Sequence, residues 1–132
     1  MAYIIHENLW WWGKSYYIIT DDAKAMVGLS INEDHPKDGY VHSLIVLESE
    51  RQKGLGNQLL QKVESIAREL NLDQIYLQAR KGTFVVDWYR RHGFEIYDEN
   101  PEDSEGQNVG MNKWLKHEIL GKIANKVARK MK

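Results

Sequence analysis

The spacing of apolar residues predicts one long amphipathic helix in the middle of the chain. Between residues 55 and 70 apolar side chains recur every three or four positions, which places them on one face of a helix. Asn71 follows the last of them and is a suitable helix terminator. The residues expected on the buried face are Leu55, Leu59, Leu60, Val63, Ile66, Ala67 and Leu70.

Runs rich in β-branched and aromatic residues predict strands on both sides of this helix. The third run is almost continuously apolar, which favours a strand near the centre of a sheet, buried on both faces. Residues 84–91 are expected to form a second, short helix. The predicted strands are 16–20, 25–31 and 41–47 before the long helix and 74–78, 93–97 and 109–114 after it, in the order β-β-β-α-β-α-β-β.

A last apolar stripe predicts a basic amphipathic helix within residues 115–132. Its apolar face is expected to dock on the body of the protein, with Lys and Arg residues around it. A solvated helix face explains these basic residues without a nucleic-acid partner, and the rest of the chain is acidic, so nucleic-acid binding is not expected. The stripe consists of Ile119, Leu120, Ile123, Ala124, Val127 and Met131.

Length and composition narrow the class of protein. The 132 residues are expected to form one domain, with residues 1–14 as a short lead before the first strand. There is no Cys, which excludes disulfides and thiolate zinc sites, and no metal site is expected. Without a leader pattern or an apolar run long enough to span a bilayer, we expect a cytoplasmic protein with no membrane partner. The three tryptophans at 10–12 are expected to cover the core rather than hold a cationic ligand.

The turn after the third predicted strand has the composition of an anion-binding loop. Arg51, Gly54 and Gly56 stand in the order R-x-x-G-x-G at the start of the predicted helix. Glycines let the backbone approach a ligand closely, and the amides at a helix N-terminus attract phosphate. A nucleoside-triphosphate loop is excluded because Asn57 stands where Lys would follow the second glycine. A dinucleotide loop is excluded because Leu59 replaces the third glycine.

Residues 43–60 resemble the acetyl-CoA-binding motif of the GNAT acetyltransferases, in which an apolar strand leads into R/Q-x-x-G-x-G/A at a helix start. Residues 88–94 resemble the later aromatic-Tyr-x-x-x-Gly-Phe segment of this family. The resemblance implies an α+β, three-layer GNAT acyl-CoA N-acyltransferase fold, with helices flanking a mixed, mostly antiparallel central sheet. It also implies that loop amides hold the CoA diphosphate and that the strand backbone pairs with the pantetheine and acetyl group. The matching residues are Arg51, Gln52, Lys53, Gly54, Leu55, Gly56 and Asn57 in the loop, and Leu44, Ile45 and Val46 in the strand.

The resemblance further implies direct transfer of the acetyl group of acetyl-CoA to a primary amine, which must first lose a proton. His42 is the first candidate for the base, since it lies two residues before Leu44 and strict alternation would place both on one face. It also matches a strand histidine of the arylalkylamine acetyltransferases. Glu48, beyond the strand end, is the alternative base. Tyr89 matches the tyrosine near the CoA sulfur and is expected to protonate the departing thiolate.

Two departures from the family pattern affect the expected site. The family commonly has Asn seven positions before the tyrosine, and this chain has Gly82, so a pantetheine contact is expected to be lost or replaced. GNAT folds usually begin with a strand and two helices, whereas only residues 1–14 precede the first predicted strand. The C-terminal helix, or a second subunit of a homodimer, could take the place of the missing wall.

The sequence leaves the acceptor and two other functions open. The acceptor could be a small amine, a polyamine, or the Lys or N-terminal amine of a protein. A regulatory module that binds acyl-CoA without transfer is one alternative, and a GNAT enzyme that acetylates aminoacyl-tRNA is the other.

Overall fold

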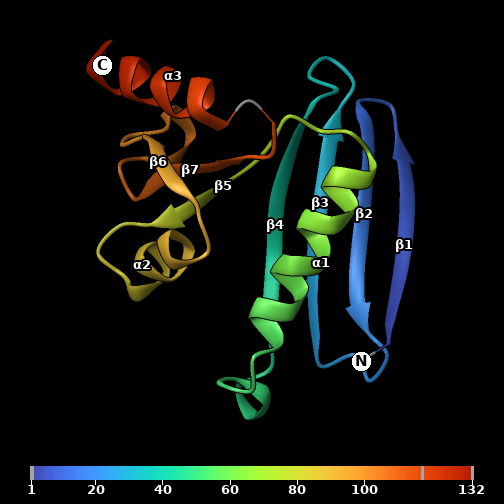
Figure 1. Cartoon of the computed structure of the whole chain (residues 1–132). Helices are drawn as coiled ribbons and strands as arrows, with labels where there is room; N and C mark the ends of the chain where they lie inside the picture. The colour runs from blue at the N-terminus through green and yellow to red at the C-terminus, as the bar shows by residue number, and fades with distance from the viewer. Residues whose placement is uncertain (1, 117, 132) are drawn as a thin grey trace. The chain divides into compact units, whose positions relative to one another are not determined.

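The computed structural model describes residues 2–116 and 118–131, and these fold into two compact units that divide between Leu72 and Asp73. The first unit contains four strands, one long helix and a single 3-10 turn (Figure 1). The second unit contains three strands, two helices and another 3-10 turn. The first unit's elements are β1 (Tyr3–Trp10), β2 (Gly13–Thr20), β3 (Ala25–Asn32), β4 (Asp38–Val46), η1 (Glu48–Glu50) and α1 (Leu55–Glu69).

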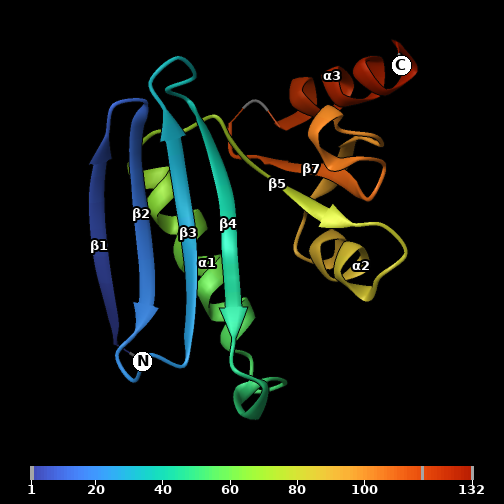
Figure 2. The ribbon, with the colours of Figure 1, turned by 180° about the vertical axis from the view of Figure 1, so that it is seen from behind.

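In the first unit, α1 packs on one face of an antiparallel sheet of strand order β1-β2-β3-β4. Val27 and Leu29 of β3 and Ile18 of β2 are completely buried beneath this helix. Figure 2 shows the same strands from behind, with α1 beyond them and no other helix of residues 2–72 in front. We call this the second face of the sheet. The helix residues that fill the core are those predicted from their spacing, namely Leu55, Leu59, Leu60, Val63, Ile66 and Ala67.

The first strand, β1, was not predicted from the sequence. It pairs with β2 along its whole length, from Tyr3 opposite Thr20 to Trp10 opposite Gly13. As an edge strand it buries little, so its residues lack the alternation of apolar and polar side chains that marks a half-buried strand. The expectation that the tryptophans at 10–12 cover the core is wrong: Trp11 is 90% exposed in the turn between β1 and β2.

The second unit is a three-stranded antiparallel sheet of order β5-β7-β6. Its core contains Ile75, Leu77 and Met111, all at most 2% exposed. The short helix α2 packs against β5 and coincides with the predicted helix. The elements are β5 (Gln74–Arg80), α2 (Phe84–Arg91), β6 (Glu95–Asp98), η2 (Glu102–Ser104), β7 (Asn108–Trp114) and α3 (Glu118–Met131).

The C-terminal helix α3 docks on β6 and β7, but not through its apolar stripe. Gly121 lies against the Trp114 ring, where an added Cβ would come within 2.3 Å of a ring carbon. Asn125 and Asn112 exchange amide hydrogen bonds of 2.7 and 3.1 Å, and both side chains are buried. Four residues of the predicted stripe are instead exposed, by 77% at Ile119, 68% at Leu120, 53% at Ile123 and 51% at Val127, and the side chain of Met131 lies outside the described part of the chain.

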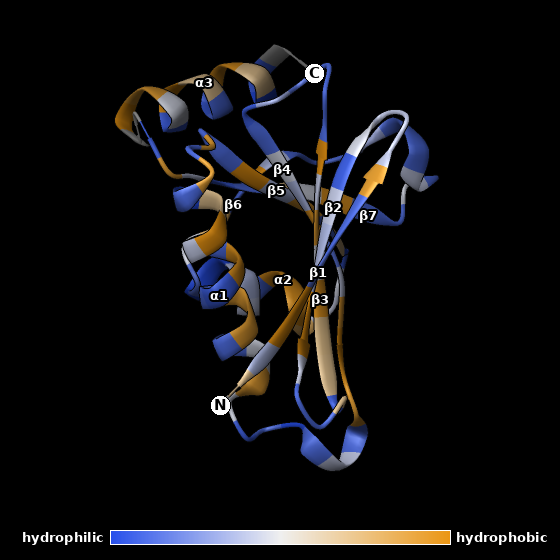
Figure 3. Cartoon of the chain, turned by 90° about the vertical axis from the view of Figure 1, so that its right-hand side faces the viewer, coloured by the Kyte–Doolittle hydropathy of each residue, from blue (hydrophilic) through white to orange (hydrophobic). Residues whose placement is uncertain are grey.

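Hydrophobic and hydrophilic segments alternate along both α1 and α3 (Figure 3). The two helices use this pattern differently, because α1 buries its apolar face and α3 buries a glycine and an asparagine. Across residues 2–116 and 118–131, no helix combines the length and apolarity that crossing a bilayer requires.

Candidate active site

The loop between β4 and α1 turns sharply through left-handed backbone conformations. Gln52 has φ 66° and Gly54, the N-cap of α1, has φ 80°. A left-handed conformation costs a non-glycine residue about 1 kcal/mol, so its presence at Gln52 marks a loop whose shape is tightly constrained. The space beside Gly54 is open, with no atom within 4 Å of a Cβ built there.

This turn leads directly into the first amides of α1. The hydrogen bond from the Gln58 amide to the Gly54 carbonyl, at 3.0 Å, is the first of the helix. The amides that precede that of Gln58, beginning with Leu55 and Gly56, lie at the positively polarised end of the helix. A helix N-terminus of this kind attracts phosphate groups.

Ion pairs and a hydrogen bond hold the charged side chains in and beside this loop. Lys53 and Lys24 both pair with Glu50, at 2.9 and 3.0 Å. These ammonium groups, Lys53 first, lower the pKa of the Glu50 carboxyl. Arg51 donates from Nε to the Val46 carbonyl at 3.1 Å, which holds its exposed guanidinium at the end of β4. Lys53 is engaged by Glu50, so of the loop's two cations Arg51 is the better placed to assist the helix amides.

A β-bulge interrupts β4 at Ser43. The register places Gly28 opposite His42 and Met26 opposite Ile45, so one extra residue of β4 lies between these pairs. Ser43 takes φ 55°, and the bulge reverses the alternation of side chains beyond it. His42 therefore shares a face with Ile45, and the expectation that it shares one with Leu44 is wrong.

His42 lies on the second face of the sheet among hydroxyl groups and aromatic rings. Its Nε2 is 2.6 Å from Ser30 Oγ, and its Nδ1 is 2.9 Å from Ser43 Oγ. Tyr40 stacks on the imidazole with ring centroids 5.6 Å apart, and Tyr17 meets it edge-on at 5.8 Å. Burial lowers the pKa of His42 below its ordinary value of 6.5, so the neutral base is favoured at neutral pH.

Glu48, the alternative base, opens the 3-10 turn η1 and is exposed. Its backbone carbonyl accepts the Arg51 amide at 3.3 Å. This carboxylate belongs to the loop, beyond the end of β4, whereas His42 lies within the strand. The two candidates therefore occupy different environments of the first unit.

Tyr89 belongs to the second unit, on the inner face of α2. It is only 8% exposed and packs edge-on against Trp88 and Phe94, with centroids 5.1 and 5.5 Å apart. Burial raises the pKa of Tyr89 to about 12. Within residues 2–116 and 118–131 its hydroxyl makes no hydrogen bond. The phenol is therefore a protonated donor with capacity for a ligand.

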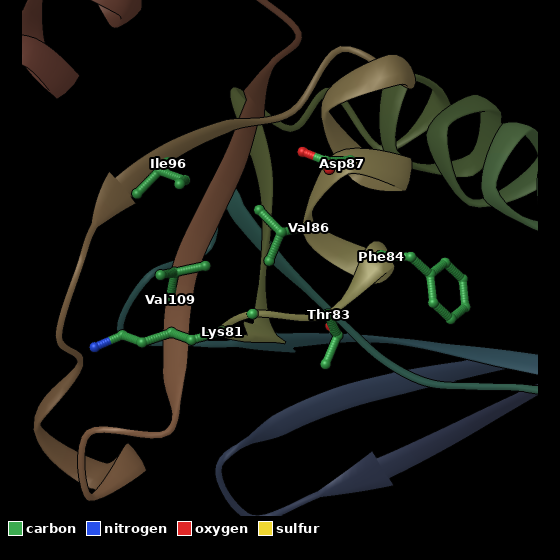
Figure 4. Close-up of a pocket in the computed structure, with 8 residues that line it drawn as sticks. Lys81, Thr83, Phe84, Val86, Asp87, Ile96 and Val109 are labelled. Atoms are coloured by element: carbon green, nitrogen blue, oxygen red, sulfur yellow. The ribbon is translucent and has the colours of Figure 1, made fainter.

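A surface pocket of about 510 Å³ opens beside the first turn of α2. Figure 4 shows Val86, Ile96 and Val109 around it and the Phe84 ring pointing away. None of its lining residues was predicted as a site residue. Gly82, which stands where the family pattern has Asn, also lines this pocket. It is exposed, with φ 71°, and no atom lies within 4 Å of a Cβ built there.

All predicted site residues except Tyr89 therefore lie in the first unit. They are His42, Glu48, the strand residues Leu44, Ile45 and Val46, and the loop and helix residues from Arg51 to Asn57. Within the described residues, no group of three or more His, Asp or Glu side chains could hold a metal ion.

Comparison with known proteins decides the family. Residues 2–94 match the model of the Acetyltransferase (GNAT) family, which is well over half of the chain. This chain belongs to the GNAT acetyltransferase family. Its fold is the GNAT acyl-CoA N-acyltransferase fold that the two motifs predicted.

Two curated GNAT relatives and one solved structure illustrate the range of this similarity. An N-terminal acetyltransferase complex ARD1 subunit homolog of Dictyostelium discoideum is 30% identical over 75% of this chain and 47% of its own length. An L-methionine sulfoximine/L-methionine sulfone acetyltransferase of Pseudomonas paraeruginosa is 32% identical over 78% of this chain and 61% of its own. An acetyltransferase of Bacillus subtilis, solved in complex with CoA, aligns with a TM-score of 0.61 and 22% identity over 79% of this chain and 78% of its own. The chain thus spans 47% to 61% of the length of these curated relatives.

A group of hydroxyl residues next to His42 was not predicted from the sequence. Ser30 of β3 contacts its Nε2, and Ser15 of β2 lies 2.9 Å from Ser30. Serine in a strand is common on solvated faces, so neither residue carried a signal alone. Only the pairing of Ser15 with Ser30 across the two strands brings the hydroxyls together.

Proposed function

We propose that this chain transfers the acetyl group of acetyl-CoA directly to a primary amine. The observation that carries the proposal is the loop from Arg51 to Asn57, in which Gly54, with open space beside it, leads into the N-terminus of α1 just after β4. When bound there, acetyl-CoA supplies an activated acetyl thioester. The protein's own residues bind its diphosphate, accept a proton from the amine and donate to the leaving sulfur.

The first step for which the protein is needed is deprotonation of the acceptor. A lysine-like amine has a pKa of about 10.4, so its neutral form costs about 4.6 kcal/mol at pH 7. His42 is neutral at this pH because burial lowers its pKa, and it can therefore accept the proton. Glu48 is the other candidate, and substitution separates the two.

Tyr89 is proposed to donate to the departing sulfur. Its pKa of about 12 keeps the hydroxyl protonated throughout the neutral range. Complete proton transfer to the thiolate of a thiol with pKa about 8.5 would cost about 5 kcal/mol. Tyr89 therefore stabilises the leaving thiolate chiefly as a hydrogen-bond donor, without accumulation of tyrosinate.

The names of the two curated relatives favour an acceptor that is a protein N-terminus or an amino acid. We therefore propose a primary amine on one of these as the first acceptor to try, ahead of polyamines and lysine side chains. Transfer is proposed to be direct, since the chain has no Cys to form a thioester intermediate.

Thiol release from acetyl-CoA, measured with pooled amino acids, peptides, polyamines and aminoacyl-tRNA, tests the proposal. We expect acceptor-dependent release of CoA and a product heavier by one acetyl group. CoA binding without release on any amine would contradict transfer and favour the regulatory module.

Substitution assigns the roles. Tyr89→Phe keeps the buried ring and removes the hydroxyl, and we expect a loss of kcat of about 10²-fold or more with little change in CoA affinity. His42→Gln is expected to reduce kcat/KM by a similar factor, whereas Glu48→Gln is expected to leave it nearly unchanged. A large loss of kcat/KM in Glu48→Gln, with little change in His42→Gln, would assign the base to Glu48.

A further inference from the structure

A continuous chain of hydrogen bonds crosses the second face of the sheet and ends at His42. Trp10 Nε1 donates to Ser15 Oγ at 3.2 Å, and Ser15 Oγ lies 2.9 Å from Ser30 Oγ. Ser30 Oγ lies 2.6 Å from His42 Nε2, and His42 Nδ1 lies 2.9 Å from Ser43 Oγ. This chain of hydrogen bonds therefore links β1, β2, β3 and β4.

The direction of these hydrogen bonds follows from the indole at the first end. The Trp10 N–H can only donate, so Ser15 Oγ accepts from it. Ser15 is 1% exposed, and its hydroxyl proton needs an acceptor, because an unsatisfied buried donor costs about 1–3 kcal/mol. Among residues 2–116 and 118–131, the acceptor in reach is Ser30. Ser30 Oγ therefore accepts a hydrogen bond from Ser15, and its own hydroxyl is left to donate to another partner.

The partner in reach is Nε2 of His42. The Ser30 to Nε2 distance of 2.6 Å is shorter than N–H donors normally make and fits an O–H donor. The Nδ1 to Ser43 distance of 2.9 Å is ordinary for an N–H donor. His42 is then the neutral tautomer with its proton on Nδ1 and its basic lone pair on Nε2.

We propose that Ser30 is a further catalytic residue, through whose hydroxyl the acceptor's proton reaches Nε2 of His42. The proposal rests on the proposed function, in which His42 is the base. The Nε2 atom has one lone pair in the ring plane, and Ser30 occupies it. Ser30 itself is only half-buried, so an amine can reach its oxygen from the second face.

The transfer conserves protons at every atom. The ammonium group of the acceptor gives one proton to Ser30 Oγ while the original hydroxyl proton of Ser30 moves to His42 Nε2. The amine becomes neutral, the Ser30 hydroxyl is restored, and the imidazolium carries the positive charge. Ser15 keeps donating to Ser30 throughout, and Ser43 keeps accepting from Nδ1, so both hold the ring and hydroxyl in place.

The surroundings of the ring favour this assignment. Gly28 lies directly opposite His42 and leaves room for the imidazole. The titratable side chains on the same face are Tyr40 and Tyr17, which pack on the ring, and His6, which is paired with Tyr17 on β1. Asp38, two residues before Tyr40 on β4, shares this face. Tyr40 lies between Asp38 and His42 along β4, and burial alone lowers the pKa of His42, so the neutral imidazole is favoured.

Nitrogen NMR of ¹⁵N-histidine-labelled protein at about pH 8 tests the tautomer directly. The His42 signals are assigned by their loss in His42→Gln. We expect the wild-type spectrum to show the proton on Nδ1 and an unprotonated Nε2. A proton on Nε2 in the wild type would overturn the proposal without need of any further variant.

Three variants then test Ser30. Ser30→Ala is expected to move His42 toward the Nε2–H tautomer and to lower kcat/KM by at least about tenfold. Ser30→Thr retains the hydroxyl and is expected to restore both. Ser104→Ala removes a buried hydroxyl of the second unit that donates to the Pro101 carbonyl, and it is expected to change neither.

The two readouts separate this inference from the proposed function. If no amine is acetylated by the wild type, the proposed function fails, and the tautomer measurement still decides whether Ser30 donates to His42. If transfer occurs but Ser30→Ala retains full kcat/KM, the passage of the proton through Ser30 is wrong. A failure of Ser30→Thr to restore activity lost in Ser30→Ala would also contradict it.

Discussion

Gly28 has no side chain at the point where the His42 ring crosses β3. A Cβ built there would lie 2.5 Å from Cε1 and 2.8 Å from Nε2 of the imidazole. Contacts this short are not tolerated, so the ring must rotate away or the strands must separate. The absence of a side chain at residue 28 is therefore part of what holds His42 against Ser30.

We accordingly predict that Gly28→Ala destabilises the protein by about 1–3 kcal/mol, the usual range for overpacking. Urea unfolding measures this free energy. In the His42→Ala background the same substitution should cost less by at least about 1 kcal/mol, because the clashing ring is gone. Equal costs in both backgrounds would show that the ring does not rest on Gly28.

The lowered pKa of His42 also predicts a dependence of stability on pH. Above pH 6.5 the side chain is neutral in both folded and unfolded protein, so it adds no pH dependence. As the pH falls from 6.5 toward the lowered pKa, the unfolded chain binds a proton that the folded protein does not. The free energy of unfolding must therefore decrease over this window.

Comparison of the wild type with His42→Gln isolates this contribution, because the remaining histidines are common to both proteins. Urea unfolding at about pH 8 and about pH 5 should show a larger loss for the wild type. The same loss in both proteins would mean that His42 titrates normally in the folded state.

Among the elements, the two helices that contain parts of the motifs were predictable from the local sequence pattern. Residues Leu55–Glu69 and Phe84–Arg91 fold as their apolar spacing indicates, because each buries one face against a sheet. The β4 bulge at Ser43 has no such signature. It depends on how β3 and β4 pair, so the face on which His42 lies could not be read from the strand alone.

The C-terminal helix shows how tertiary packing can override an apolar stripe. Spacing predicted burial of Ile119 and Ile123, but the buried positions are Gly121 and Asn125. A glycine admits the Trp114 ring at close range, and an asparagine finds a matching amide in Asn112. Neither contact can be inferred from the spacing of apolar residues. The boundaries of this helix were therefore better predicted than the face that it buries.

The loop before α1 allows a matched test of the proposed diphosphate site. Gly54 and Gly106 have nearly the same φ, 80° and 78°, and neither has an atom within 4 Å of a built Cβ. Alanine should therefore strain the backbone equally at both, by about 1 kcal/mol. Only Gly54 lies at the N-terminus of α1.

Calorimetry with CoA is expected to show weaker binding by Gly54→Ala and unchanged binding by Gly106→Ala. Urea unfolding should confirm that the two variants lose similar stability. Equal CoA affinities for both variants would place the diphosphate elsewhere.

At the scale of the whole molecule, the family and the order of elements could be inferred from two short motifs, but the arrangement around the base could not. The motifs are local in sequence, so Arg51, Gly54 and Tyr89 stood out. The chain of hydrogen bonds that ends at His42 joins Trp10, Ser15, Ser30 and His42, which lie on four different strands. Its members become neighbours only through the register of three strand pairs.

A ligand that binds only the folded chain must stabilise it, and this gives a test of the diphosphate site on the intact protein. CoA at a hundredfold excess over its Kd should add about 2.7 kcal/mol to the free energy of unfolding. For a chain of this length that corresponds to a rise in Tm of order 10 °C. Because the proposed donors are the amides at the N-terminus of α1, the rise should depend on the diphosphate. Pantetheine, which has the same thiol arm without the phosphates, should raise Tm far less at equal concentration. An equal rise with both ligands would show that the thiol arm supplies the affinity and that the loop does not hold the diphosphate.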